Sequence, residues 1–375
     1  MYTDFKLTMN YSRHFLTIGF FFTALTFVQA FVFNTILDAL FADTRWLLVF
    51  IVSVIISIGS IYVYYLSHST SDENIDRLYN SVGLWWGLLF NLFLGALGYW
   101  LIMFFTGTLG FALIPLMIAV AIFIYGLKKA QQVHIKKLQL SHPNFPADWD
   151  NKRLIFISDL HLGKTLNQDF LEKIVVAINE HQPEIVMIGG DLFDSTYADW
   201  SKVLAPLDNI DAEHVLYVTG NHEYYVNYET ELRPHLEQFD IELLESNTIN
   251  INGLNIGGIS HSLSDINFNF ESEYKKLGFK PNQPNIFLYH EPVPKDSQFA
   301  LNNHTTLQLS GHTHFGQIAP YNLITWITYG HFDYGLYQDP NTKSYQYTSS
   351  GTGTWGPPVR TTAKPEVVVI ELQNS

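Results

Sequence analysis

Cysteine is absent from all 375 residues of this sequence. Without thiols the chain can form neither a disulfide framework nor a metal site with thiolate ligands. Any metal that it binds must therefore be held by nitrogen and oxygen. The lack of cysteine does not select a compartment, because a cysteine-free protein can lie on either side of a membrane.

Positive charge is scarce. The chain has 21 Lys and Arg against 35 Asp and Glu, so its formal net charge is −14. Affinity for DNA or RNA rests on basic side chains that neutralise phosphates, and this balance argues against a nucleic-acid partner. It does not exclude a small phosphate substrate, because bound divalent cations can reverse the charge of a site.

Charge of either sign is nearly missing from residues 15–127, which contain two basic and five acidic side chains. Crossing a bilayer takes about 20 residues of helix. Four apolar runs are long enough to do so, namely Phe15–Leu37, Leu47–Leu66, Val82–Phe105 and Leu109–Leu127. A cleaved signal peptide would explain only the first run, and soluble proteins seldom contain such long apolar segments. We therefore predict an all-α transmembrane region of four helices over residues 1–127.

The basic residues near the ends of these runs predict the orientation. Those before the first run and after the last are Lys6, Arg13, Lys128, Lys129, Lys136 and Lys137, whereas the two longer loops contain one each, Arg45 and Arg77. Basic flanks favour the cytoplasmic side, and an even number of spans places both ends there. We expect a multi-pass inner (cytoplasmic) membrane protein with its C-terminal domain on the cytoplasmic side. The runs themselves contain no charged residue, and Asp38 lies just beyond the end of the first. Transporters usually have ionisable residues inside their spans, so we expect these helices to be an anchor.

From Lys128 onward the composition is that of a soluble domain. We expect a linker and first strand over residues 128–152 and the main domain over 153–375. Strand-like segments alternate with helical ones, which predicts an α/β fold. The strands are Leu154–Ser158, Ile185–Ile188, Val215–Val218 and Ile286–Tyr289, and the helices are Leu166–His181 and Tyr228–Phe239. In layered α/β folds, binding sites gather at the carboxyl ends of the strands.

Polar clusters with metal-binding side chains follow these strands. They are SDLHLG, GGDLFD, GNHEYY, YHEP and SGHTHFGQ, and the candidate ligands are Asp159, His161, Asp191, Asn221, His290, His312 and His314. In two clusters the ligands are two residues apart, which places them on one face of an extended chain. Each fragment alone is common by chance, but the five in this order predict one shared site.

Oxygen and imidazole ligands without sulfur suit Mn(II), Fe(II) or Zn(II). Seven ligands are too many for one four-coordinate zinc ion and about right for two ions that share Asp191. Two such cations can clamp a phosphoryl group and hold a hydroxide between them. We therefore predict two divalent metal ions, with manganese preferred and iron or zinc as alternatives.

These strings, together with SSGTGTWGPPVR (Ser349–Arg360), resemble the calcineurin-like metallophosphoesterase superfamily and, within it, a membrane-anchored bacterial subgroup. The resemblance extends over residues 153–372 and implies a four-layer αββα sandwich. It implies that Asp159, His161 and His314 hold one metal, that Asn221, His290 and His312 hold the other, and that Asp191 bridges them. Phe315 stands where the subgroup often has glycine.

The resemblance also implies that His222 faces the substrate and binds no metal. We expect this imidazole to protonate the leaving oxygen or to bind a phosphate oxygen. Arg360 and Glu223 are candidate substrate contacts, with a surface ion pair as the alternative for Arg360. Asp194 could orient a ligand or cap a turn. The other histidines are interpreted as structural. His261, which follows the strand-like segment Leu254–Ile259, is the first of them to consider as a further site residue.

The predicted function is hydrolysis of a phosphomonoester, phosphodiester or pyrophosphate bond by attack of a metal-bridging hydroxide. The membrane anchor and the aromatic-rich stretch Tyr321–Tyr337 favour a lipid-linked substrate. The resemblance suggests a phospholipid-type diester or the pyrophosphate of UDP-diacylglucosamine, while a soluble phosphodiester stays open. The alternative function is a catalytically inert, metal-binding membrane signalling protein. A transporter with a regulatory hydrolase domain would need buried charge in its spans. The sequence does not predict the oligomeric state.

Overall fold

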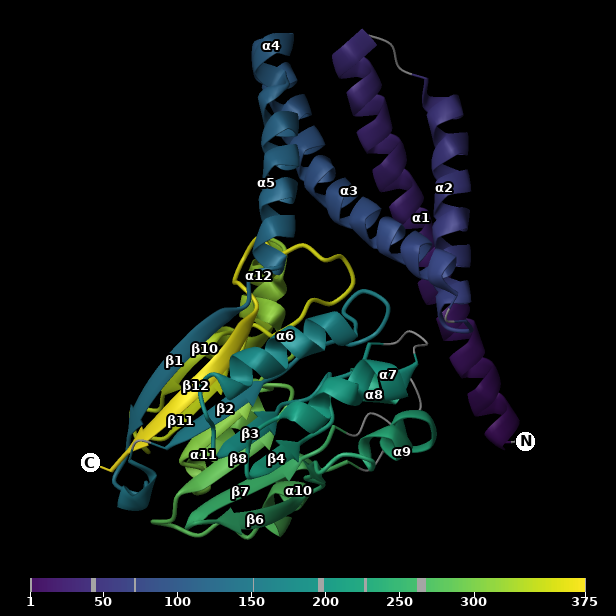
Figure 1. Cartoon of the computed structure of the whole chain (residues 1–375). Helices are drawn as coiled ribbons and strands as arrows, with labels where there is room; N and C mark the ends of the chain where they lie inside the picture. Colours follow the sequence, from purple (N-terminus) through teal and green to yellow (C-terminus); the bar gives the residue numbers. More distant parts are fainter. Residues whose placement is uncertain are drawn as a thin grey trace. The chain divides into compact units, whose positions relative to one another are not determined.

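The computed structural model describes residues 2–41, 45–70, 72–150, 152–194, 199–225, 228–261 and 268–374. The chain forms two compact units, Met1–Tyr125 and Gly126–Ser375 (Figure 1). We call them the N-terminal and C-terminal units and describe each by itself. The boundary falls inside one helix, so the C-terminal unit begins with the last turn of an apolar helix.

The N-terminal unit is helical. Its helices are α1 (Tyr2–Phe41), α2 (Trp46–Ser67), α3 (Glu73–Thr106), α4 (Leu109–Ala112) and α5 (Ile114–Ala130), the last of which continues into the C-terminal unit. Four segments are long and apolar enough to cross a membrane: Phe22–Phe41, Trp46–Ser67, Glu73–Thr106 and Leu109–Ala130. By length and composition, they agree with the prediction of four spans and overlap the four predicted runs.

Small side chains and satisfied polar groups hold these helices together. A Cβ atom on Gly95 would lie 2.9 Å from both the Ala119 Cβ and the Pro115 carbonyl oxygen, so glycine permits close contact between α3 and α5. Gln29 on α1 donates to the Ser57 hydroxyl at 2.7 Å and accepts from the Trp85 indole at 3.1 Å. These polar groups inside the unit are thus paired with one another, as the interior of a membrane requires.

The C-terminal unit contains two six-stranded sheets. The first has the order β1-β12-β2-β3-β4-β5 and the second the order β10-β11-β9-β8-β7-β6. The strands of the first are β1 (His134–Ser141), β2 (Arg153–Ile157), β3 (Ile185–Ile188), β4 (His214–Tyr217), β5 (Glu242–Leu243) and β12 (Glu366–Gln373). Those of the second are β6 (Asn247–Ile251), β7 (Leu254–Ile259), β8 (Asn285–Tyr289), β9 (Leu307–Ser310), β10 (Gly335–Gln338) and β11 (Tyr345–Thr348).

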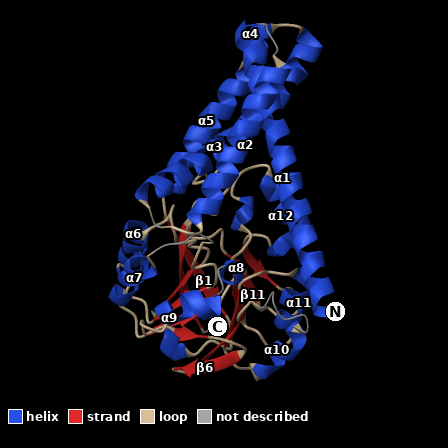
Figure 2. Cartoon of the chain, turned by 90° about the vertical axis from the view of Figure 1, so that its right-hand side faces the viewer, coloured by secondary structure: helices blue, strands red, loops and turns tan. Residues whose placement is uncertain are grey.

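The two sheets pack face to face between two layers of helices (Figure 2). Side chains of β2 alternate between the two faces of the first sheet. Ile155 and Ile157 point to the outer core under α6 (Gln168–Asn179) and α7 (Trp200–Leu204), whereas Leu154 and Phe156 enter the core between the sheets. On the other side, α10 (Phe270–Lys276) and α11 (Pro294–Asn302) cover the second sheet. The fold is the predicted four-layer αββα sandwich.

The remaining helices are short. They are α8 (His222–Tyr225), α9 (Arg233–Leu236), α12 (Tyr321–Tyr329), a π-helical turn (Tyr228–Leu232) and four 3-10 turns (Ala147–Trp149, Ala205–Asn209, His314–Gly316 and Gly330–Phe332). The helix predicted over 228–239 is present over 228–236, but as a π-helical turn followed directly by α9 and not as one regular α-helix. Pro234 has no backbone N–H and is tolerated only in the first turn of a helix, so α9 starts afresh around it.

The strand pairing determines where the polar clusters meet. The strands β2, β3 and β4 are parallel neighbours in the first sheet, and β8 and β9 are parallel neighbours in the second. Parallel strands end at the same edge of a sheet. The loops after these five strands therefore share one edge of the sandwich.

Candidate metal centre

Five loops at this edge bring the seven predicted ligands together. Asp159 and His161 follow β2, Asp191 follows β3, Asn221 follows β4, His290 follows β8, and His312 and His314 follow β9. All of these residues are at least nine-tenths buried except His312. The structure thus places five stretches, far apart in the sequence, around one small volume.

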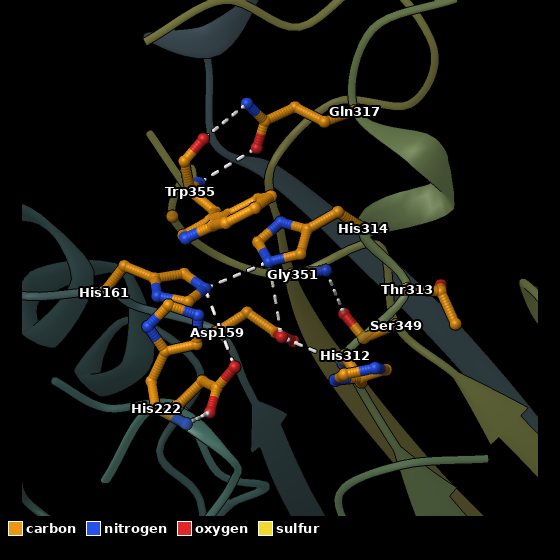
Figure 3. A network of polar contacts seen from close by, with 12 residues as sticks. Asp159, His161, His222, His312, Thr313, His314, Gln317, Ser349, Gly351 and Trp355 are labelled. Atoms are coloured by element: carbon orange, nitrogen blue, oxygen red, sulfur yellow. Dashed lines mark hydrogen bonds and ion pairs between the residues drawn. The ribbon is translucent and has the colours of Figure 1, made fainter. Parts of the chain in front are cut away.

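The first group of ligand atoms comes from Asp159, His161 and His314, all within 4.8 Å of one another. The Nε2 atoms of the two imidazoles are 3.0 Å apart, and His314 Nε2 is 3.4 Å from Asp159 Oδ1 (Figure 3). Burial, reinforced by neighbouring positive charge, lowers the pKa of both His161 and His314 well below the usual value. Neutral imidazoles keep a lone pair, which a metal ion requires.

The second group comes from Asp191, His290 and His312. The Gly189 carbonyl accepts from His290 Nδ1 at 2.7 Å, which leaves Nε2 directed at Asp191 Oδ2, 3.1 Å away. Burial opposes charge on His290, but the Asp191 carboxylate raises the pKa of His290 to about 10. Asn221 Oδ1 lies 2.8 Å from His312 Nδ1, so the amide oxygen joins the same group. The surroundings of His290 therefore stabilise positive charge.

Asp191 connects the two groups. Its Oδ2 lies 3.8 Å from His161 Nε2 and 3.1 Å from His290 Nε2, whereas its Oδ1 accepts from the backbone N–H of His222 at 2.8 Å. One oxygen is therefore held by the backbone and the other is presented to both imidazoles. This is the arrangement that a bridging carboxylate needs.

The donor set fits a pair of divalent cations. Asp159 Oδ2 is buried and has no hydrogen-bond partner among the described residues. A buried carboxylate oxygen without a partner is costly, and a bound cation would remove that cost. Hard oxygens and neutral imidazoles are ligands that Mn(II), Fe(II) and Zn(II) accept.

The ligand loops have an unusual backbone. Five ligands have positive φ angles: Asp159 (52°), His161 (48°), Asp191 (50°), His312 (70°) and His314 (49°). Side-chain-bearing residues seldom adopt this left-handed conformation, and it persists where surrounding contacts enforce it. Tight packing holds the backbone of these loops in this conformation, since a Cβ atom on Gly220 would lie 2.2 Å from Asp191 Oδ1.

Glu223 was expected to contact the substrate, and the structure gives it another role. Its carboxylate is fully buried and accepts hydrogen bonds from the backbone N–H groups of Asp191, Leu192, Phe193 and Gly220, at 2.7–3.2 Å. Burial, with a contribution from the Asp191 charge, raises the pKa of Glu223 to about 7, while these amide donors oppose the rise. Glu223 therefore fixes two ligand loops relative to each other.

Arg360 is likewise not at the surface. The guanidinium is fully buried, donates to the Gly353 carbonyl at 2.6 Å and lies 3.1 Å from His314 Nδ1. Burial lowers its pKa to about 10. Burial rules out the surface ion pair considered for Arg360, and the guanidinium contacts the candidate ligand His314.

His222 lies beside the first group, and one of its ring nitrogens is within 4.8 Å of ligand atoms of His161 and Asp191. Its ring centroid is 4.6 Å from that of His161 and 5.9 Å from that of Trp355, and its Nδ1 lies 3.9 Å from Asp194 Oδ1. Asp194 is thus placed to orient His222 electrostatically. Asp194 was expected to orient a metal ligand or to cap a turn, and the structure places it beside the candidate catalytic imidazole.

Sequence reasoning assigned no role to Trp355 or Gln317. The Gln317 side chain donates to the Trp355 carbonyl at 2.9 Å and accepts from its N–H at 2.9 Å (Figure 3). This pair holds the exposed Trp355 ring next to His222. Both residues lie in strings that already stood out, but a backbone clamp of this kind has no sequence pattern.

The sequence also singled out Phe315 and His261. Phe315 has a φ of 48° and stacks on Tyr334 with ring centroids 4.7 Å apart, so its backbone conformation is one that glycine would adopt without strain. His261 is buried, and its pKa is lowered to about 4 by burial and by nearby His290. It therefore lies close to the second ligand group.

Glu223→Gln should weaken metal binding. The substituted side chain would place an NH2 group, which cannot accept, against backbone N–H groups that now donate to the Glu223 carboxylate. A buried hydrogen bond would be lost, at a cost of about 1–3 kcal/mol. We expect Mn(II) affinity to fall by about tenfold or more in isothermal titration. Glu180→Gln, at an exposed helix end, should bind as the unmodified protein does. Equal affinity in both variants would show that the Glu223 carboxylate does not position the ligands.

Comparison with known proteins agrees with this geometry. A family model described as calcineurin-like phosphoesterase matches residues 152–316. The chain is 35% identical over 226 residues to an uncharacterized metallophosphoesterase of Helicobacter pylori, covering 59% of each protein. It is 30% identical to the uncharacterized metallophosphoesterase YkuE of Bacillus subtilis, covering 61% of this chain and 82% of that protein.

A third relative shows that the similarity is not limited to bacteria. The chain is 27% identical to a transmembrane protein with metallophosphoesterase domain from Bos taurus, covering 69% of this chain and 62% of that protein. The chain spans 59% of the length of the first Helicobacter relative. Four candidate spans and such relatives indicate a membrane protein. The family model, these relatives and the αββα sandwich lead to one conclusion: the chain belongs to the calcineurin-like metallophosphoesterase family.

Proposed function

We propose that this protein is a membrane-bound phosphoesterase that uses two divalent cations to hydrolyse a phosphate ester. The observation that carries the proposal is the position of Asp191 Oδ2 between His161 and His290. Structural ion pairs rarely leave so many neutral imidazoles and an unpaired carboxylate oxygen in one buried volume. A metal site with hydrolytic chemistry accounts for both.

The ligands divide between the two cations. Asp159, His161 and His314 would hold one ion, Asn221, His290 and His312 the other, and Asp191 both. When bound, such ions polarise a phosphoryl group and supply a nucleophilic water near neutral pH. Manganese is our preferred ion, and the same donors also accept iron or zinc.

His222 would handle the proton of the leaving group. Its imidazole lies beside the first ligand group, where it packs edge-to-face on the rings of His161 and Trp355. The ring donates its proton to the departing ester oxygen as the phosphorus–oxygen bond breaks. The Asp194 carboxylate, whose Oδ1 lies 3.9 Å from His222 Nδ1, would help to orient the ring.

We further propose that the substrate is linked to a lipid and that the C-terminal unit lies on the cytoplasmic side of an inner membrane. The basic residues after the last span support the orientation. The C-terminal unit continues directly from a candidate membrane helix, α5, and this connection to the bilayer supports a lipid-linked substrate. The phosphate ester could be a monoester, a diester or a pyrophosphate.

The first experiment measures hydrolysis of a chromogenic phosphodiester by the full-length protein in detergent with Mn(II). We expect turnover that an excess of chelator abolishes and that added Mn(II) restores. An inert, metal-binding signalling protein would bind Mn(II) stoichiometrically and hydrolyse neither this diester nor a chromogenic monoester. That result would refute the enzymatic proposal.

His222→Ala should separate chemistry from metal binding. Loss of a general acid lowers turnover about 10²–10⁴-fold, whereas the metal content measured by elemental analysis should stay unchanged, because His222 is not among the proposed ligands. His134→Ala, at an exposed strand residue, is the matched control and should keep full activity. Full turnover in His222→Ala would remove this residue from the mechanism.

A lipid-linked substrate can be recognised by comparing acylated and deacylated forms of the same phosphate ester. In detergent micelles, the acylated form should be cleaved with the higher kcat/KM, because its chains concentrate it at the surface where the enzyme lies. Equal values for both forms would favour a soluble substrate. Activity on the chromogenic diester serves as the control for intact chemistry.

A further inference from the structure

The helix α12 turns apolar side chains outward. Its more buried side chains are Asn322, Thr325 and Tyr329, whereas its exposed ones include Leu323, Ile324, Trp326 and Ile327. These four apolar side chains are 57%, 53%, 61% and 76% exposed, and no residue of α12 is charged. A helix at a water-exposed surface normally shows the opposite arrangement.

Hydrogen bonds connect the start of α12 to the end of α5. Within the C-terminal unit, the last turn of α5 is bonded to the loop 359–362, since Arg360 N donates to the Gly126 carbonyl at 3.0 Å and Lys129 Nζ to the Thr361 carbonyl at 3.3 Å. The Thr361 hydroxyl accepts from Ala319 N at 2.8 Å, two residues before α12 begins. Figure 1 shows α12 beside this loop.

The last turn of α5 is also the end of a candidate membrane span, Leu109–Ala130. The loop 359–362 is therefore tied to the point where the chain leaves the bilayer, and α12 is tied to that loop. A tryptophan and three aliphatic side chains at this level suit the interface between head groups and acyl chains.

The same helix is connected to the metal centre at its other end. Tyr329 donates to Glu291 Oε1 at 2.9 Å, and its ring centroid lies 5.9 Å from that of His312. Glu291 Oε1 is in turn 3.7 Å from His312 Nε2. The position of α12 thus bears directly on the second ligand group.

We propose that the outer face of α12, formed by Leu323, Ile324, Trp326 and Ile327, docks on the lipid bilayer that the protein spans. Through Tyr329 and Glu291, this contact would hold the second ligand group near the membrane surface. It is a contact of the protein with lipid and does not depend on which phosphate ester the enzyme cleaves. Continuity with the end of the span favours the bilayer over a second protein as the occupant.

The absence of cysteine allows a direct test. Single variants Ile327→Cys and Leu323→Cys of the full-length protein carry a nitroxide label in nanodiscs of phosphatidylethanolamine and phosphatidylglycerol. Val176→Cys is the matched control, because Val176 is an aliphatic residue on α6 with 58% exposure. Electron paramagnetic resonance measures collisions of each label with oxygen, which is enriched in bilayers, and with a water-soluble nickel chelate.

We expect the labels at 327 and 323 to lose accessibility to nickel and to gain accessibility to oxygen, relative to the label at 176. Equal accessibility at all three positions would overturn the proposal. Labels at 327 and 323 shielded from both reagents, with spin–spin broadening that unlabelled protein dilutes away, would identify a second copy instead. Unchanged Mn(II) stoichiometry in each variant confirms that the C-terminal unit is intact, and two independent positions on one face guard against a local effect of either substitution.

Discussion

The structure depends on how one carboxylate is held. Asp191 Oδ1 is fixed by the backbone N–H of His222, and Asp191 Oδ2 points between His161 and His290. Burial opposes this charge, but His290, His161 and His222 together outweigh it and hold the pKa of Asp191 well below its usual value. Everything else at this edge of the sandwich keeps that arrangement in place: Glu223 pins the flanking loops, glycines make room, and the two sheets bring loops from five strands to a common edge.

Much of this architecture was predictable because it follows from local patterns. The apolar runs are long enough to cross a bilayer, and the short β-branched segments before Asp159 and Asp191 are typical of buried strands. The spacing of the ligands and their place after strands predicted that they would meet. The structure brings all seven together, and their roles as ligands stay a proposal.

The parts that sequence reasoning missed depend on tertiary contacts. Arg360 carries the charge expected of a phosphate-binding group, but its guanidinium bonds to a backbone carbonyl and lies against the His314 imidazole, and the Glu223 carboxylate bonds to backbone N–H groups. Charge alone does not say whether a side chain faces a cavity or supports its wall. The left-handed backbone at Asp159 or His312 is equally invisible in a sequence, because loop contacts rather than residue type enforce it.

Gln317 joins two parts of the protein that serve different purposes. Its side chain holds Trp355 beside His222, and its main-chain carbonyl accepts from Thr361 N at 2.9 Å, in the loop bonded to the end of α5. One residue therefore fixes the spacing between the Trp355 ring and the loop 359–362, so a change in the backbone of that loop would be passed to the indole beside His222.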